Sequence, residues 1–154
     1  MPGRVKREAL ATLAEMRAER DRRWAYELKL EGFPHRNRHL THYVLEGREV
    51  IAAPFMDWAM WFEHVGRGRI VAQTKCRGRL VSTVFLGLDH NWAETGDPLI
   101  FETMVFADVE PGSEPLFQCR WSTYDEAEQG HAYTLALTEA GGPWVSPSDT
   151  GSDG

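Results

Sequence analysis

Apolar residues along this chain change their spacing several times, and each change predicts a different element of secondary structure. From about residue 4 to residue 31 they recur every three or four positions, which is the spacing of one helix face. Gly32 and Pro34 follow, as is typical of the end of a helix. We therefore predict a long N-terminal helix that either packs against the rest of the chain or serves as a docking or dimerising arm.

Beyond this helix the pattern predicts a strand pair and a second helix. The segment from His42 to Ala53 surrounds a central EGRE and is typical of two short strands joined by a turn. After Pro54 the run FMDWAMWFEHV has helical spacing, and Gly66 ends it. Its apolar stripe consists of Phe55, Trp58, Trp61, Phe62 and Val65. We expect this stripe to be buried against the sheet, because exposed aromatic stripes of this size are rare in monomeric proteins.

Four later segments predict an antiparallel meander. They are rich in apolar and β-branched residues and are separated by turn or loop residues, the first two by Arg77 and Gly78. The segments are Arg69 to Cys76, Leu80 to Leu88, Leu99 to Phe106 and Leu116 to Trp121. Thr123 then begins a helix, since Thr123 and Glu126 have the spacing of a capping box.

The last residues predict no packed structure. After Gly141, Gly142 and Pro143 the chain becomes SPSDTGSDG, which lacks the apolar surface needed to offset the entropy of ordering. The predicted fold class is α+β, with a mostly antiparallel sheet of about four to six strands packed by helices. Its parts are a long N-terminal helix at residues 1–34, an α+β domain at 35–140 and a disordered C-terminal tail at 141–154.

Length, cysteine content and hydropathy limit where in the cell the protein is expected to work. A chain of 154 residues is long enough to bury a core without disulfides. Cys76 and Cys119 lie far apart, no signal peptide opens the chain, and no apolar run approaches the roughly 18 residues of a membrane span. We therefore expect a cytoplasmic protein without a membrane partner.

Charge is distributed unevenly along the chain. Residues 1–50 carry eleven Lys and Arg against eight Asp and Glu, a net +3 within a total of −6, which leaves −9 for residues 51–154. Five basic residues nevertheless fall close together in this acidic part: Arg67, Arg69, Lys75, Arg77 and Arg79. The cluster is either a solvated hairpin or a nucleic-acid contact. The acidic remainder suits solubility or a basic protein partner.

Four motifs carry a family resemblance. WAMWFEH, STVFLGLDH, LIFETMVF and WSTYDEAEQGH occur in this order, within roughly residues 43–135. This stretch resembles a group of small uncharacterised proteins encoded by tailed bacteriophages and prophages, often of high-GC bacteria. The resemblance implies a phage origin and a setting in the host cytoplasm, and it assigns no activity and no catalytic residue. The N-terminal helix and the HRNRHLTH stretch lie outside it.

Four polar residues stand out within the predicted body, and each has a structural alternative to a functional role. They are Asp89, His90, Glu102 and His131. Glu102 could pair with Arg120 on the next strand, since an unpaired buried carboxylate is costly. Asp89 could begin an Asx-turn and His90 could be solvated. His131 follows Gly130 on the inner face of the last helix, where close packing against the sheet and a satisfied core histidine are the simpler interpretation.

The same residues also suggest a metal site. If His90, Glu102 and His131 converged, with Asp89 as a further candidate, they could hold zinc or manganese and activate water for hydrolysis. Their spacing matches no short ligand motif, so convergence depends on the fold.

A second candidate metal site consists of His35, His39 and His42, which would share one face of a helix. Pro34 and the strand that follows favour a polar connector instead. Arg36 and Arg38 would also repel a cation there.

The sequence leaves three functional hypotheses open. Motifs for nucleotide binding and acyl transfer such as GxGxxG, GxxxxGK[ST] and GxSxG are absent. The leading hypothesis is a phage-encoded accessory protein that binds a protein partner, without a cofactor, and modulates host metabolism or defence. The alternatives are a small metal-dependent hydrolase that uses His90, Glu102 and His131, and a nucleic-acid-binding protein that uses the basic cluster.

Overall fold

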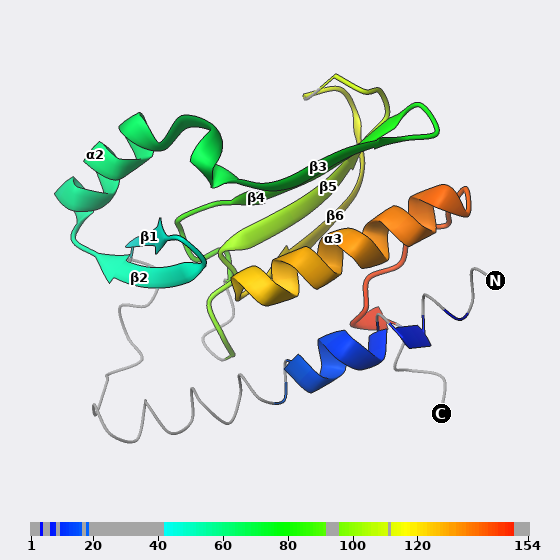
Figure 1. The fold of residues 1–154 in the computed structure, drawn as a ribbon, viewed down its shortest axis with the longest axis horizontal. Helices are drawn as coiled ribbons and strands as arrows, with labels where there is room; N and C mark the ends of the chain where they lie inside the picture. The colour runs from blue at the N-terminus through cyan, green and yellow to red at the C-terminus, as the bar shows by residue number, and fades with distance from the viewer. Residues whose placement is uncertain are drawn as a thin grey trace.

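The computed structural model divides the chain into a main body and a smaller lobe. It describes residues 4, 7–8, 10–16, 18, 42–91, 96–110 and 112–149. The lobe is a two-stranded antiparallel hairpin followed by a helix, and the body is a four-stranded antiparallel sheet with a long helix on one face (Figure 1). The α+β class and the mostly antiparallel sheets are therefore confirmed.

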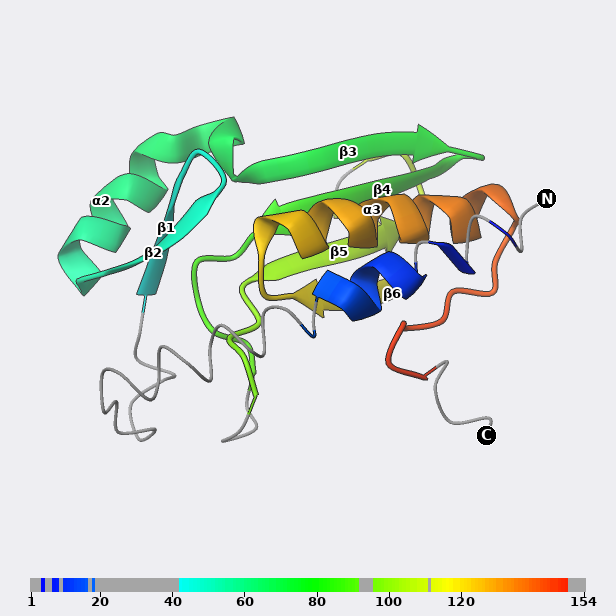
Figure 2. The same ribbon diagram turned by 60° about the horizontal axis from the view of Figure 1, so that its bottom comes forward.

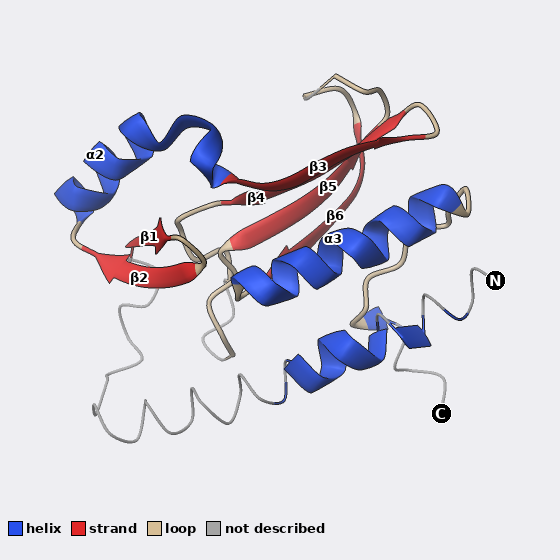
Figure 3. Cartoon of the chain, in the orientation of Figure 1, coloured by secondary structure: helices blue, strands red, loops and turns tan. Residues whose placement is uncertain are grey.

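The lobe forms from residues 42–69 and agrees closely with the predicted strand pair and helix. Its elements are β1 (His42–Glu46), β2 (Glu49–Ala53), α2 (Phe55–Val65) and a 3-10 turn, η2 (Gly66–Arg69). Gly47 takes a φ of 62° in the β1–β2 turn, a left-handed conformation that glycine adopts without a steric penalty. Figure 3 shows the lobe beyond the end of the main sheet.

The main sheet is the predicted meander, with strand order β3-β4-β5-β6. Its strands are β3 (Ile70–Cys76), β4 (Arg79–Phe85), β5 (Phe101–Phe106) and β6 (Pro115–Trp121). Side chains alternate between two faces, and β5 shows this directly, because Phe101, Thr103 and Val105 are buried while the residues between them are only half-buried. The buried face lies under α3 (Tyr124–Glu139).

The helix α3 begins as the capping-box spacing predicts. Thr123 is its N-cap, and the Thr123 side chain accepts a hydrogen bond of 3.1 Å from the Glu126 backbone N–H. The Glu126 carboxylate accepts the backbone N–H of Ser122 at 3.0 Å, one residue earlier than in the standard box. Glu126 is 1% exposed, so this carboxylate fixes the chain where β6 turns into α3.

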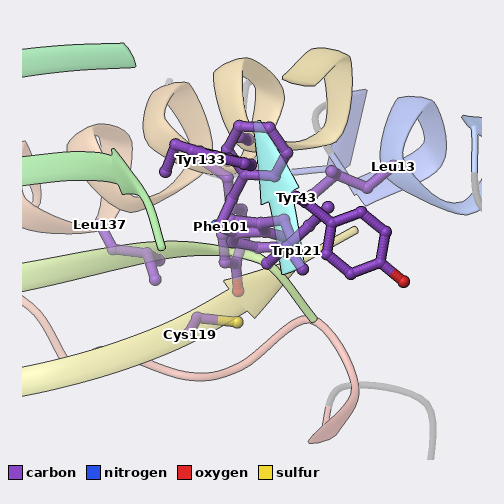
Figure 4. Close-up of a cluster of buried hydrophobic side chains, with 10 residues drawn as sticks. Leu13, Tyr43, Phe101, Cys119, Trp121, Tyr133 and Leu137 are labelled. Carbon is purple, nitrogen blue, oxygen red and sulfur yellow. The ribbon is translucent and has the colours of Figure 1, made fainter. Parts of the chain in front are cut away.

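The core lies between the sheet and the helices (Figure 4). Aromatic side chains from β4, β5, β6 and α3 supply most of it, among them Phe85, Phe101, Trp121 and Tyr133. Leu13, on the N-terminal helical segment at residues 10–16, is 1% exposed and belongs to the same cluster. Figure 2 shows this segment beside α3, on the same face of the sheet. Among the described elements, none covers the opposite face (Figures 1 and 2).

The prediction of a long N-terminal helix is confirmed only in part, because the continuous helix among the described residues is short, at residues 10–16, and is packed rather than free. Its described part ends at Ala18, so residues 19–31 of the prediction lie outside the described residues. Packing is the first of the two alternatives left open by the sequence, and the 1% exposure of Leu13 supports it.

The prediction of a disordered tail from residue 141 is wrong for residues 143–146. Trp144 packs against the core, and its indole N–H donates a 3.0 Å hydrogen bond to the Thr138 hydroxyl. The Val145 carbonyl accepts the Tyr133 hydroxyl at 2.7 Å. One tryptophan thus supplies the apolar area that the polar composition of this segment appeared to lack. Residues 150–154 lie outside the described residues.

The predicted burial of the α2 stripe is also wrong. Trp58, Trp61, Phe62 and Val65 are only half-buried, Phe55 is 58% exposed, and no residue of α2 is buried. The stripe stays partly exposed because α2 does not lie on the inner face of the sheet. The buried face of the sheet is occupied by α3 and residues 10–16, so α2 packs instead on β1 and at the end of the sheet.

Candidate functional site

The predicted site residue His131 belongs to a hydrogen-bonded network inside the body. We call it the threonine–histidine network, and its members are Thr74, Thr83, Thr103, Trp121 and His131. His131 Nδ1 lies 2.8 Å from Thr83 Oγ1, and its Nε2 lies 2.9 Å from Thr74 Oγ1. Thr83 Oγ1 lies 2.7 Å from Thr103 Oγ1, which accepts the Trp121 indole N–H at 2.9 Å. The satisfied core histidine is therefore confirmed.

The donors and acceptors of this network suit a neutral imidazole. The indole N–H can only donate, so Thr103 Oγ1 accepts it, and one consistent arrangement continues from the Thr103 hydroxyl to Thr83 and from the Thr83 hydroxyl to His131 Nδ1. In that arrangement His131 Nε2–H donates to Thr74. Burial lowers the pKa of His131 below its ordinary value of 6.5. A neutral imidazole with both nitrogens engaged is thus a structural cross-link between α3 and strands β3 and β4.

Glu102 lies on the opposite face of the sheet from His131. Thr103 points toward α3, so Glu102, the preceding residue of β5, points away. Glu102 and Arg120 are register partners, and Arg120 Nε donates to Glu102 Oε2 at 3.0 Å. Gln118 Nε2 donates to the same oxygen at 2.8 Å. The predicted Glu102–Arg120 pair is confirmed, and on the other side of β5 Glu102 lies opposite Val84.

Asp89 and His90 organise the loop after β4. Asp89 Oδ1 accepts the backbone N–H groups of Asn91 and Leu99 at 2.8 Å and 2.9 Å, and the first of these bonds closes the predicted Asx-turn. The His90 backbone N–H donates to the Leu99 carbonyl at 2.9 Å, which joins the two ends of the loop.

The candidate metal ligands therefore do not converge. A sheet separates Glu102 from His131, and Asp89 is committed to backbone N–H groups. Within the part of the chain that the structure describes, no three His, Cys, Asp or Glu side chains are grouped to hold a metal ion. Of the second candidate set, His35 and His39 lie outside the described residues, while the His42 ring packs 4.8 Å from that of Trp58.

The five basic residues do not form one surface. Arg67 and Arg69 precede β3, whereas Lys75, Arg77 and Arg79 lie at its far end, about 20 Å away along a seven-residue strand.

Three of the five basic side chains also have partners within the protein. The Arg69 guanidinium lies 4.0 Å from the centre of the Phe62 ring and donates to the Phe85 carbonyl at 3.2 Å, and burial lowers its pKa. Arg77 and Arg79 donate to the backbone carbonyls of Glu139 and Ala107. This arrangement gives no continuous positive surface of the kind that tracks a phosphate backbone.

A cavity of about 420 Å³ lies beside β6, between this strand and the C-terminal segment. Its lining residues are Leu99, Gln118, Cys119, Arg120, Trp121, Glu126, Ser146 and Ser148. The two charged members already make internal contacts, Arg120 with Glu102 and Glu126 with the Ser122 backbone. Because both charged side chains are used in contacts within the protein, the cavity gives no indication of a catalytic or ligand-binding site.

Most of the exposed large apolar side chains among the described residues lie on α2. Phe55, Met56 and Met60 are 58%, 65% and 58% exposed, and we call these three residues the α2 patch. The other side of the same helix is apolar as well, so Asp57, Glu63 and His64 are its only polar residues. A helix that is apolar nearly all round is normally buried. The sequence revealed the apolar residues but not that part of them would face solvent.

Aromatic contacts hold the helix beneath the α2 patch in place. Phe55, Trp58 and Phe62 follow one another with ring centres 6.0 Å and 5.1 Å apart, and the His42 ring lies edge-on to Phe55 at 5.3 Å. Trp61 meets Phe85 of the core edge-on at 5.6 Å. The patch is therefore presented on a preorganised aromatic support, which reduces the entropy lost on binding.

Two carboxylates accompany the α2 patch. Asp57 and Glu63 are exposed, and neither forms an ion pair with another described residue. The charge next to the patch is therefore negative, in keeping with the net charge of −9 over residues 51–154.

Models of known protein families, curated proteins and solved structures were compared with the chain. None of them matches. The site must therefore be interpreted from its own geometry. Among the described helices, none is both long and apolar enough to span a bilayer.

Proposed function

We propose that this chain is a phage-encoded accessory protein that acts by binding another protein through the α2 patch. One observation carries the proposal: three large apolar side chains on one helix are more than half exposed, although the rest of that helix is apolar too. Isolated exposed apolar residues are ordinary, whereas adjacent ones on a rigid support mark interaction surfaces.

The chemistry of the α2 patch suits a protein partner. Phenylalanine and methionine are enriched at interfaces, and methionine adapts to irregular surfaces because its side chain is unbranched and polarisable. The position of the patch is suitable as well, since α2 lies in the lobe, beyond the end of the main sheet (Figure 1).

The proposed setting follows from the sequence resemblance. The resemblance implies a setting in the host cytoplasm, so the proposed partner is a host or phage protein present there. Its capture would modulate host metabolism or defence. This function requires no cofactor, in contrast to hydrolysis at His90, Glu102 and His131, which the arrangement of those residues does not support.

Affinity capture from bacterial cells that express the protein tests the proposal. Met56→Ser with Met60→Ser removes most of the patch without touching the core, so the free energy of unfolding is expected to change by less than about 0.5 kcal/mol per substitution. Leu116→Ser is the matched control, because Leu116 is another exposed apolar residue, 36% exposed on β6. The wild type and the control should retain a partner protein that the double variant loses. Retention of the same proteins by all three would contradict the proposal.

A further inference from the structure

The carboxylates beside the α2 patch indicate the chemistry of its partner. Met60 follows Asp57 by three residues and precedes Glu63 by three, and residues three apart on a helix are neighbours, with Cβ atoms about 5–6 Å apart. Met60 therefore has a carboxylate on each side. Both carboxylates are exposed and, among the described residues, without an ion-pair partner.

We infer that the α2 patch binds a basic amphipathic helix of its partner. Apolar residues of that helix pack on Phe55, Met56 and Met60, and its Lys or Arg residues lie beside Asp57 and Glu63. This inference rests on the proposed function and specifies the partner that it requires. It is carried by charge complementarity, since an apolar surface flanked by unpaired carboxylates selects apolar segments that carry positive charge.

Carboxylates elsewhere in the described body show what distinguishes this place. Asp125 and Glu128 at the start of α3 pair with Arg48 from the β1–β2 turn. Glu110 and Glu139 are exposed and, like those of α2, form no ion pair with another described residue, but α2 carries three of the four large apolar side chains that are exposed among the described residues. On α2, negative charge therefore lies next to exposed apolar side chains, and no described Lys or Arg of this protein pairs with it.

The same charges disfavour two other occupants. A second copy of the chain that packed its α2 patch against this one would bring Asp57 and Glu63 close to their own equivalents, and like charges across an interface oppose association. A nucleic acid or an anionic surface would also be repelled. The eleven-residue helix α2 that carries the patch is about 16 Å long, so its length matches about three turns of a partner helix.

A pair of synthetic peptides provides the test. One is a capped amphipathic peptide of about 14 residues, roughly four turns, made of Leu and Lys. The other has the same Leu positions and Glu in place of Lys. Binding is followed by NMR of the protein labelled in its methionine methyl groups, where Met56 and Met60 report on the α2 patch and Met104 on the sheet serves as an internal reference.

The Leu/Lys peptide is expected to shift the Met56 and Met60 signals but not that of Met104, and to bind at least about tenfold more tightly than the Leu/Glu peptide. Asp57→Asn with Glu63→Gln should weaken its binding roughly threefold to tenfold, the range expected for two exposed ion pairs. Glu110→Gln with Glu139→Gln, which neutralises two exposed carboxylates elsewhere, should leave the affinity unchanged.

Equal affinity for the two peptides, or equal weakening by both double variants, would overturn the basic-helix inference. The proposed function would survive either result if cellular capture still depended on Met56 and Met60. A dimer in sedimentation experiments that dissociates in the Met56→Ser, Met60→Ser variant would also overturn the inference, because the occupant would then be a second copy of the chain.

Discussion

Gly130 of α3 lies directly against the indole of Trp121 on β6: a Cβ atom at Gly130 would be only 2.2 Å from Trp121 Cε2. Such a distance requires either the helix or the indole to move. Trp121 is 1% exposed and hydrogen-bonded to Thr103, so it has little room to do so. Glycine is thus the residue that lets α3 approach the sheet closely enough for His131 to reach its threonine partners.

Gly130→Ala is therefore expected to destabilise the protein, although alanine favours a helix over glycine by about 1 kcal/mol. Overpacking of this kind costs about 1–3 kcal/mol, measured as the free energy of unfolding by urea denaturation. Ala132→Gly, at an exposed position two residues later, is the matched control and should cost about 1 kcal/mol through helix propensity alone. An increase in stability for Gly130→Ala would show that the indole is free to move aside.

His131 should make stability depend on pH. Burial lowers the pKa of His131 in the folded state, so below about pH 6.5 the unfolded chain binds a proton that the folded protein does not. The free energy of unfolding should therefore fall as the pH drops below 6.5, by at most about 1.4 kcal/mol per pH unit from this group. Denaturation at pH 7.5 and 5.5 checks this for the wild type and for His131→Gln. The variant should lose less stability over the interval, and an equal loss would assign the effect to other groups.

Thr103→Val tests the centre of the threonine–histidine network. The substitution removes the hydroxyl that accepts the Trp121 indole N–H and also contacts Thr83. Loss of an acceptor for a buried donor costs about 1–3 kcal/mol in the free energy of unfolding. Thr134→Val is the control, since this buried hydroxyl donates only to the Gly130 carbonyl within α3. Equal stability losses for the two variants would mean that the network adds nothing beyond ordinary threonine packing.

Glu102→Gln should behave as a change in a partly exposed ion pair. The side chains of Glu102 and Arg120 are 13% and 32% exposed, and glutamine keeps an oxygen that can accept from Arg120 and Gln118. We expect a loss of about 1 kcal/mol or less by urea denaturation. A loss near 3 kcal/mol would instead indicate a fully desolvated pair.

The sequence predicted the parts of this structure that depend on local spacing. The bounds of α2, the four strands of the meander, the Thr123 cap, the Asx-turn at Asp89 and the Glu102–Arg120 pair all follow from patterns spanning few residues or adjacent strands. The inner position of His131 and the close packing at Gly130 were also predicted, because α3 has one inner face.

The surfaces depended on long-range packing and could not be predicted in the same way. The spacing of Phe55, Trp58 and Phe62 identifies an apolar helix but does not specify which other element covers it. The apolar pattern fits α2 and the N-terminal residues equally well as a cover for the inner face of the sheet. In the structure Leu13 of the N-terminal segment is buried there, and α2 is not. Near the C-terminus, Trp144 is held by the core and by its hydrogen bond to Thr138, although the residues around it are mostly polar. Both partners are known only from the three-dimensional fold.

The core also has a consequence for how the protein is made. The meander pairs strands that follow one another along the chain, which favours rapid pairing, whereas Leu13 joins the cluster of Trp121 and Tyr133 only across more than a hundred residues of chain. During synthesis on a ribosome, Leu13 can therefore be buried only after α3 has been synthesised. We expect the packing of residues 10–16 to follow the pairing of the sheet.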